Sequence, residues 1–442
     1  MSTSFSSRSI MAFVNLSLRL LKIAPENQVV RWEAVGEVNT SGRRNPRPSR
    51  GRHGLKSAAP AGGRMSIEAW RSAFPAVRQG RVHLNNCSAG PVPERGLEAR
   101  REFERTWIEA GNPWEEWLKR VDDAKALFAA LIGADPDEVA VLSCATQALA
   151  QVASAFDYDG RDEVVVTDLE FPTVPQFWRA QGRRGARVRV AESPDGRRVP
   201  ADAYADALSE DTLLVCSSHA YSFTGGLMDV GAVADAVHDR GGYLFLDAYQ
   251  SAGVVPIDVD AMGVDVLVSG ALKFLLGGPG IAFLYVDREV AAELEPTNLG
   301  WFGVDDVFGV ETRDPAYAPG ARRFELGTPP APNAYTASAG MELLREVGLD
   351  TIRERVVEHT RRLIEGADRE GFTVRTPRAD EHRGGVVNVQ VADPEGAADA
   401  MLDRGFNLST RAGGVRLSPH FYNTAEEIDA AVETLAEVAA PG

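Results

Sequence analysis

Cysteine is scarce in this chain of 442 residues, which has only three. Three thiols cannot build a disulfide framework, and they point to a reducing compartment. Long apolar runs are missing too, since none reaches the length of a membrane span although 44% of the residues are hydrophobic. We therefore expect a cytoplasmic protein with large buried cores and no membrane partner.

Positive charge is also in short supply, because 47 Lys and Arg residues face 63 Asp and Glu residues and leave a net charge of −16. The first 64 residues are rich in arginine, so the rest of the chain is more acidic than the total suggests. A strongly acidic body disfavours binding to nucleic acid and to anionic membranes. The composition fits a solvated cytoplasmic protein.

The first 64 residues lack the periodic pattern of the remainder and include a Pro/Gly/Arg tract, 41–53, that cannot bury a core. Three interpretations stay open. The start site is placed too early and Met65 opens the protein, or the stretch is a disordered tail, or it is an Arg- and Ser-rich targeting peptide. We favour the first.

From Met65 onward, apolar strand-like segments alternate with helical ones. The strands are expected at 161–167, 212–217, 242–246, 264–268 and 281–286. This alternation predicts an α/β fold with a mostly parallel sheet and helices on both faces.

After about residue 340 the pattern changes to a long amphipathic stretch, 339–370, and then to short apolar segments at 386–391 and 414–417. We expect a large domain at 65–340 and a smaller α+β domain at 341–442. Whether the segment 65–100 joins the small domain stays open.

Lys273 lies between two apolar runs and precedes the glycine-rich turn 277–280. An ammonium group with little water around it has a lowered pKa, and the free amine can then condense with an aldehyde. We interpret Lys273 as a Schiff-base lysine. The alternative is a lysine whose stem lies along apolar surface at a strand end.

Asp247 ends the strand expected at 242–246, and ligands bind at the carboxyl ends of parallel strands. An aspartate there can keep a pyridine nitrogen protonated, so that the ring withdraws electrons from a bound amino acid. Gln250 can hydrogen-bond the phenolic oxygen of such a ring. The alternative for Asp247 is a turn or helix cap.

Two further strand ends complete the pattern. Ala145 and Thr146 open a helix after a strand at 139–143, where free N–H groups and the helix dipole attract phosphate. Phe171 follows a strand that begins at Glu163, and its ring can stack on a planar cofactor. The ordinary alternatives are an N-cap threonine and a core phenylalanine.

Taken together, these residues resemble the class V aminotransferase family of pyridoxal-phosphate (PLP) enzymes, which includes cysteine desulfurases, kynureninases and isopenicillin N epimerase-like proteins. The likeness runs from about Leu84 to the C-terminus. Its most specific part is the Asp-x-x-Gln motif at Asp247 and Gln250, followed at family spacing by Lys273. The resemblance implies the aspartate aminotransferase-like fold, called fold type I, and PLP as cofactor.

The likeness also implies a role for each residue. Lys273 would carry the internal aldimine, Asp247 would meet the pyridine nitrogen and Gln250 the phenolic oxygen. Ala145 and Thr146 would bind the phosphate. Phe171, in Phe-Pro-Thr, is similar to the stacking aromatic of kynureninases, and no metal is implied.

Three later positions extend the resemblance. The stretch 322–329 resembles the family's Arg-Phe-Glu-x-Gly-Thr-Pro, whose threonine, here Thr328, reaches the phosphate of the neighbouring subunit. Trp301 lies in a segment similar to one of kynureninases whose indole meets the same phosphate. Both likenesses imply a homodimer. Arg416 resembles the arginine that grips the substrate carboxylate with two parallel bonds.

The chain also departs from the family. Many relatives have serine three residues before the lysine and histidine or tyrosine just before it, whereas this chain has Gly270 and Leu272. Ser269 is a candidate to supply the missing phosphate hydroxyl, although it lies one residue out of register with the family serine. The loop 408–415 lacks the cysteine with which desulfurases attack their substrate, so persulfide chemistry of the usual kind is not expected.

The expected reaction begins with an amino acid held by Arg416 and an α-proton taken by Lys273 as general base. Our first choice is a class V aminotransferase-like enzyme acting on an L-amino acid. A PLP-dependent lyase of C–S or C–C bonds and an epimerase stay open. A non-catalytic scaffold and a sugar aminotransferase are more distant. His219 and Tyr221 either face the substrate or lie behind the site, and we favour the second position.

Overall fold

The computed structural model describes residues 66–309 and 314–442. The interpretations of residues 1–64 concern a part of the chain outside these ranges. Within them, no helix is both long enough and apolar enough to cross a membrane.

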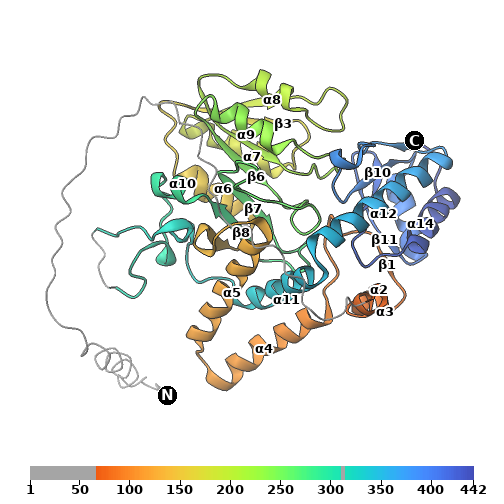
Figure 1. Ribbon diagram of the computed structural model, residues 1–442, viewed down its shortest axis with the longest axis horizontal. Helices are drawn as coiled ribbons and strands as arrows, with labels where there is room; N and C mark the ends of the chain where they lie inside the picture. The colour runs from red at the N-terminus through yellow and green to blue at the C-terminus, as the bar shows by residue number, and fades with distance from the viewer. Residues whose placement is uncertain (1–65, 310–313) are drawn as a thin grey trace, which may run out of the picture. The chain divides into compact units, whose positions relative to one another are not determined.

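A seven-stranded sheet forms the centre of the described chain (Figure 1). Its strand order is β2-β8-β7-β6-β5-β3-β4. The strands are β2 (Val139–Leu142), β3 (Glu163–Thr167), β4 (Arg187–Ala191), β5 (Thr212–Ser218), β6 (Tyr243–Asp247), β7 (Val266–Gly270) and β8 (Ala282–Val286). All neighbours from β4 to β7 pair in parallel, and β8 runs antiparallel to β2 and β7. The predicted α/β fold with a mostly parallel sheet is confirmed.

Helices cover both faces of this sheet, because successive strand residues point to opposite sides and both sets are apolar. Leu244 and Leu246 of β6 pack into one core, and Phe245 between them packs into the other. The first core is closed by α5 (Trp114–Ile132), α8 (Ala201–Ala207), α9 (Val230–His238) and α11 (Ala331–Val347). The second is closed by α6 (Ala145–Ser154), α7 (Thr173–Ala180) and α10 (Arg288–Glu293). α4 (Glu94–Ala110) packs against α11.

The C-terminal residues form a separate antiparallel sheet of order β12-β13-β10-β9 with a core of its own. The elements are α12 (Leu349–Arg369), β9 (Thr373–Val374), β10 (Val387–Gln390), α13 (Pro394–Asp403), β12 (Ser409–Arg411), β13 (Gly414–Leu417) and α14 (Ala425–Val438). β1 (Val82–His83) pairs in parallel with β11 (Phe406–Asn407), after the short helices α2 (Ile67–Arg71) and α3 (Pro75–Arg78). The segment before α4 therefore contacts the C-terminal elements.

The amphipathic stretch expected at 339–370 is not one helix. α11 continues through residue 340 to Val347, and α12 begins at Leu349. Gly348 separates them with φ of +89°, a left-handed conformation that favours glycine and ends a helix. The predicted domain boundary at 340/341 thus falls inside α11, and the division into two domains stays a prediction.

A buried ion pair fixes the segment that contains Thr328. Lys125 Nζ of α5 lies 2.7 Å from Glu325 Oε1, and both side chains are buried. The same oxygen accepts a hydrogen bond from the backbone N–H of Val141 in β2 at 3.1 Å. The stretch 322–329 is therefore tied to the edge of the central sheet.

Glu325→Ala should lower the free energy of unfolding by about 3–5 kcal/mol, because it removes the buried partner of the Lys125 ammonium and leaves only the exposed Asp122, at 3.5 Å. The matched control is Asp123→Ala, which breaks the exposed Lys119–Asp123 pair of the same helix and should change stability by less than about 1 kcal/mol. Denaturant unfolding of both variants measures the difference. Equal losses in the two variants would contradict the account.

Candidate active site

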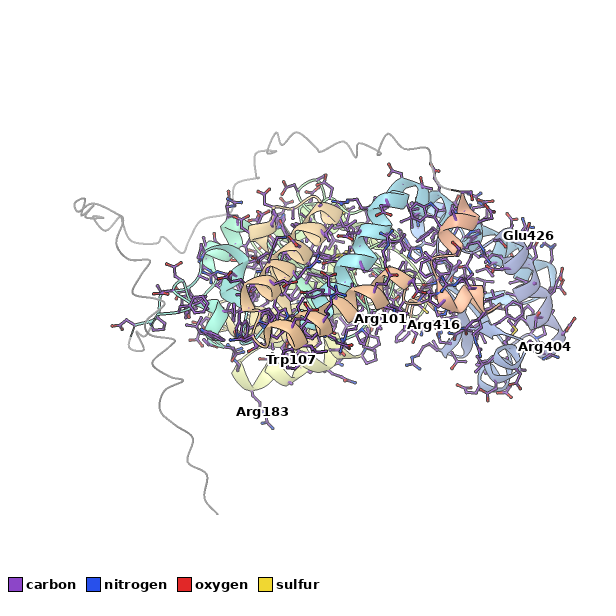
Figure 2. The ribbon with its side chains drawn as sticks, turned by 90° about the horizontal axis from the view of Figure 1, so that it is seen from below. Arg101, Trp107, Arg183, Arg404, Arg416 and Glu426 are labelled. Atoms are coloured by element: carbon purple, nitrogen blue, oxygen red, sulfur yellow. The ribbon has the colours of Figure 1, made fainter. Side chains whose placement is uncertain are left out.

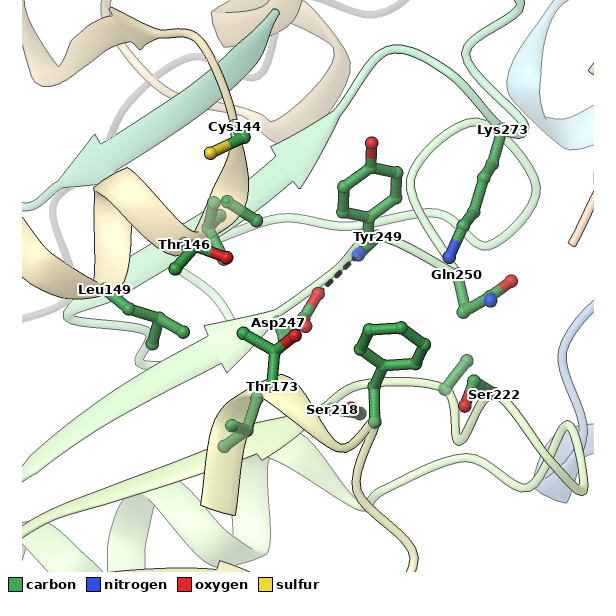
Figure 3. A pocket seen from close by; sticks show the side chains of 15 residues that line it. Cys144, Thr146, Leu149, Thr173, Ser218, Ser222, Asp247, Tyr249, Gln250 and Lys273 are labelled. Atoms are coloured by element: carbon green, nitrogen blue, oxygen red, sulfur yellow. Dashed lines mark hydrogen bonds between the residues drawn. The ribbon is translucent and has the colours of Figure 1, made fainter. Parts of the chain in front are cut away.

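The candidate site is a cavity of about 240 Å³ at the carboxyl ends of the parallel strands (Figure 3). Its lining comes from the loops and helix starts that follow five strands: Cys144, Ala145, Thr146 and Leu149; Phe171, Thr173 and Val174; Ser218, Ala220 and Ser222; Asp247, Tyr249 and Gln250; Val268 and Lys273. Six of the residues predicted from the sequence meet here: Ala145, Thr146, Phe171, Asp247, Gln250 and Lys273. The other four do not line the cavity.

Lys273 and Asp247 face the same cavity, and burial disfavours the charged form of each. Loss of water lowers the pKa of Lys273, and the nearby Asp247 charge opposes this only in part. Burial likewise raises the pKa of Asp247, against its hydrogen bond from the Tyr249 N–H at 2.9 Å and the Lys273 charge. Both shifts favour the neutral forms of the two groups.

Two aromatic rings surround the lysine amine. Nζ of Lys273 lies 4.4 Å from the centre of the Tyr249 ring and 5.6 Å from that of Phe171. Phe171 is 42% exposed. Its ring presents a flat apolar surface on which a planar ligand can stack.

The backbone around Lys273 is held from two distant parts of the chain. The Gly90 N–H donates to Leu272 O at 2.9 Å, and a Cβ at Gly90 would lie 2.3 Å from Lys273 O. On the other side, His420 Nε2 lies 3.0 Å from Phe274 O. Because the Phe421 N–H donates to Nδ1 of His420, the proton is on Nε2 and is donated to the carbonyl.

The N-terminus of α6 offers unused donors at one end of the cavity. Its N-cap, Cys144, makes no side-chain cap bond. Among the described residues, no hydrogen-bond acceptor is found for the backbone N–H of Ala145 or Thr146. Such groups, at the positive end of a helix dipole, form an anion site.

Further polar atoms of the lining lack partners within the described chain. Gln250 donates from Nε2 to Cys87 O at 3.0 Å, while its Oε1 is buried without a bond. Ser222 Oγ is in the same state. A buried polar group without a partner costs about 1–3 kcal/mol, so the cavity suits a polar ligand that supplies the missing bonds.

Arg416 borders the site from β13. Its guanidinium donates to Ser222 O at 2.8 Å and to Ser409 Oγ at 2.9 Å, and its buried Nε has no partner within the described ranges. Ser222 links it to the cavity, since this serine belongs to the lining. The unused N–H can donate to a carboxylate.

The structure places Ser269 away from the cavity, contrary to the role expected for it. Its buried hydroxyl contacts Ala248 O at 3.5 Å and Gly270 O at 3.4 Å. The reason is strand alternation: Val268 lines the cavity, so the next residue of β7 points to the other side. A shift of one residue along a strand cannot replace the family serine.

Trp301 and Thr328 are both exposed and lie outside the cavity lining. The Trp301 indole N–H donates to Val307 O, and its ring meets Trp114 edge-on at 6.0 Å. The positions expected to reach a neighbouring subunit therefore face outward from this chain. His219 and Tyr221 are buried and do not line the cavity either.

The sequence reasoning missed Glu170, a buried carboxylate next to Phe171. It accepts hydrogen bonds from Thr167 Oγ1 at 2.9 Å and from Ser218 Oγ at 2.6 Å. Burial nevertheless raises the pKa of Glu170 to about 7, although these donors lower it. The sequence did offer a signal for Glu170, because an acidic residue follows closely after the carboxyl end of β3.

Known proteins are similar to this chain in sequence. A sequence model described as aminotransferase class-V matches residues 109–431. The uncharacterised aminotransferase YcbU of Bacillus subtilis is 36% identical over 84% of this chain and 97% of its own length. A probable cysteine desulfurase of Aeropyrum pernix is 29% identical over 85% of this chain and 98% of its own.

Solved structures share the fold. The cysteine desulfurase of Thermococcus onnurineus superposes with a TM-score of 0.77 at 23% identity, covering 84% of this chain and 98% of that one. The predicted fold type is confirmed by this likeness.

Glu170→Gln should remove a pH dependence of stability. Because the folded protein binds the Glu170 proton more tightly than the unfolded chain, wild-type stability falls between about pH 4.5 and 7, by about 3 kcal/mol at most. Relative to the variant, the wild type should therefore lose stability as the pH rises through this window. Denaturant unfolding at pH 4.5, 6 and 8 measures it. The control Glu109→Gln, at an exposed site on α4, should differ in stability from the wild type by the same amount at all three pH values. The same constant difference for Glu170→Gln would contradict the account.

Proposed function

The chain belongs to the aminotransferase class-V family of PLP-dependent enzymes, and from this premise we propose that it transfers the α-amino group of an L-amino acid. The observation that carries the proposal is the meeting of three groups around one cavity: a desolvated lysine amine, a carboxyl group at a strand end, and a helix N-terminus with free N–H donors. Each fits one part of the cofactor.

The residues that line the cavity have the chemistry needed to hold PLP. The free N–H groups of Ala145 and Thr146 would bind the phosphate, and Phe171 would stack on the ring. Asp247 would hold the proton of the ring nitrogen, a cation that favours the carboxylate form. Gln250, with one amide N–H donated to Cys87 O, has a second for the phenolic oxygen.

When bound, PLP supplies an aldehyde and an electron-withdrawing ring that stabilises negative charge at the α-carbon of an amino acid. Lys273 would hold the aldehyde through its amine and, once the amine of the substrate has taken that place, would accept the α-proton as a general base. Its lowered pKa serves both steps, since an ammonium can do neither. The rings of Tyr249 and Phe171 lie next to this amine.

Arg416 is the proposed carboxylate site. Its bonds to Ser222 O and Ser409 Oγ fix the guanidinium plane, and Nε is left for the substrate. Holding the carboxylate orients the α C–H bond toward the base, which lowers the entropy cost of proton transfer. The substrate would thus be an amino acid rather than an amino sugar.

A lyase acting on a C–S bond is the second candidate, favoured by the likeness to proteins described as cysteine desulfurases. Thiolate attack of the usual kind lacks its nucleophile, because the loop 408–415 has no cysteine. Cys87 comes near this loop, with Sγ 3.8 Å from Ser409 Oγ, but it is buried. Transamination needs no such thiol.

We further propose a homodimer. Exposed apolar side chains gather where α4, α5 and the segment after Gly300 meet: Trp107 (labelled in Figure 2), Ile108, Trp301 and Phe308. Edge-on ring contacts join Trp107 through Trp117 and Trp114 to Trp301 and Phe308. Such a patch favours a protein partner, and a second copy would bring Trp301 and Thr328 to its site.

The proposed domains are a large PLP-binding domain around the seven-stranded sheet and a small C-terminal domain that also includes β1. A cytoplasmic location is supported by the cysteines, since Cys87, Cys144 and Cys216 are all free.

Addition of PLP to the purified wild-type protein should produce the visible absorbance of a lysine-bound cofactor. Lys273→Ala should lose this absorbance, whereas the control Lys119→Ala, at an exposed site, should keep it. A panel of L-amino acids is then screened for loss of the absorbance. A transaminase gives a 2-oxo acid without ammonia, and a lyase gives a cleaved side chain. A wild-type protein that takes up no PLP would overturn the proposal.

Arg416→Lys should raise KM for the amino acid that reacts in this screen by about ten- to a hundredfold, because a charged hydrogen bond is worth about 1.5–3 kcal/mol. The reaction of the corresponding amine, which lacks the carboxylate, should change little. Arg411→Lys, at an exposed position of β12, is the control. An equal effect of Arg416→Lys on the amino acid and the amine would contradict the assigned role.

A further inference from the structure

We propose that the Tyr249 hydroxyl binds the phosphate of the cofactor, from the space that a side chain at position 270 would otherwise fill. This inference rests on the proposed function and adds to it a residue within the Asp-x-x-Gln motif. Tyr249 lines the cavity together with Cys144, Ala145 and Thr146, which form the start of α6.

The contact between Tyr249 and Gly270 shows that the two positions share one space. A Cβ on Gly270 would lie 2.2 Å from both Cζ and Oη of Tyr249, far closer than real atoms approach. The backbone of Gly270 does not itself require glycine, since its φ is not in the left-handed region. Glycine is therefore needed at the end of β7 because the phenol lies over it.

The position and state of the hydroxyl suit an anion. In Figure 3 it points away from Asp247 and lies on the side of the cavity near Cys144. Burial, with the Asp247 charge and Cys144 nearby, raises the pKa of Tyr249 to about 12, so the hydroxyl stays protonated and can donate. No partner for it is found in the described part of the chain, and the first N–H groups of α6 are free beside it.

The ring and the hydroxyl of Tyr249 have separable tasks. The ring lies against the Lys273 amine, with 4.4 Å between Nζ and the ring centre, and the backbone N–H donates to Asp247. Tyr249→Phe keeps both contacts and removes only the oxygen. It is therefore the variant that isolates phosphate binding.

The test measures by equilibrium titration how tightly the cofactor-free protein binds PLP and how tightly it binds pyridoxal, which lacks the phosphate. Tyr249→Phe should weaken PLP binding about ten- to a hundredfold and leave pyridoxal binding unchanged. Unchanged PLP affinity, or equal losses for both ligands, would overturn the inference. If the wild type binds no PLP, the proposed function itself fails, which is a different result.

A swap of the two side chains provides the second arm. Gly270→Ser alone should weaken PLP binding, because its side chain meets the phenol. Combining Gly270→Ser with Tyr249→Ala removes the clash and returns a hydroxyl to the same space, so PLP affinity should exceed that of Tyr249→Ala alone. No gain from the added serine would contradict a shared phosphate site. Should Gly270→Ser fail to fold, Tyr249→Phe still decides.

Discussion

The desolvation of one lysine amine beside one carboxyl group is the constraint on which the site depends. Lys273 and Asp247 reach the same cavity because β6 and β7 are adjacent parallel strands that end at one edge of the sheet. Water would keep both groups charged, and burial shifts the pKa of each group toward its neutral form. In the proposed function, this cavity would supply a reactive amine without a dedicated base.

The position of the Lys273 amine depends on segments near both ends of the described chain. The Lys273 turn is bonded by Gly90, from the loop before α4, and by His420, from the loop after β13. Burial lowers the pKa of His420 to about 4, so the ring stays neutral and keeps its Nε2 proton for Phe274 O. Tyr422 adds a bond from its hydroxyl to Asn86 Oδ1 at 2.9 Å. The N- and C-terminal segments hold the reactive turn in register with the sheet.

Residues at strand ends could be predicted from the sequence because each is marked locally, by an apolar run followed by a polar or aromatic residue. Asp247, Lys273, Thr146 and Phe171 all come from such junctions, and parallel pairing brings the junctions together. The expected sheet followed from the same runs.

What depends on the direction of a side chain or on distant pairing could not be predicted. The offset of Ser269 by one residue was visible in the sequence, but the structure was needed to show that its hydroxyl faces away from the cavity. The importance of Tyr249 depends on its contact with Gly270, 21 positions away, and that of Glu170 on hydroxyls of β5 that are distant in sequence. The break at Gly348 was hidden because the apolar pattern continues across it.

The central claim, that the amine of Lys273 is the one poised to condense with an aldehyde, is tested most directly by borohydride reduction of the protein mixed with PLP, followed by peptide mass mapping. The account predicts a single pyridoxyl group on the peptide that contains Lys273, at a stoichiometry near one per chain. Labelling spread over exposed lysines such as Lys119, with Lys273 unmodified, would contradict it.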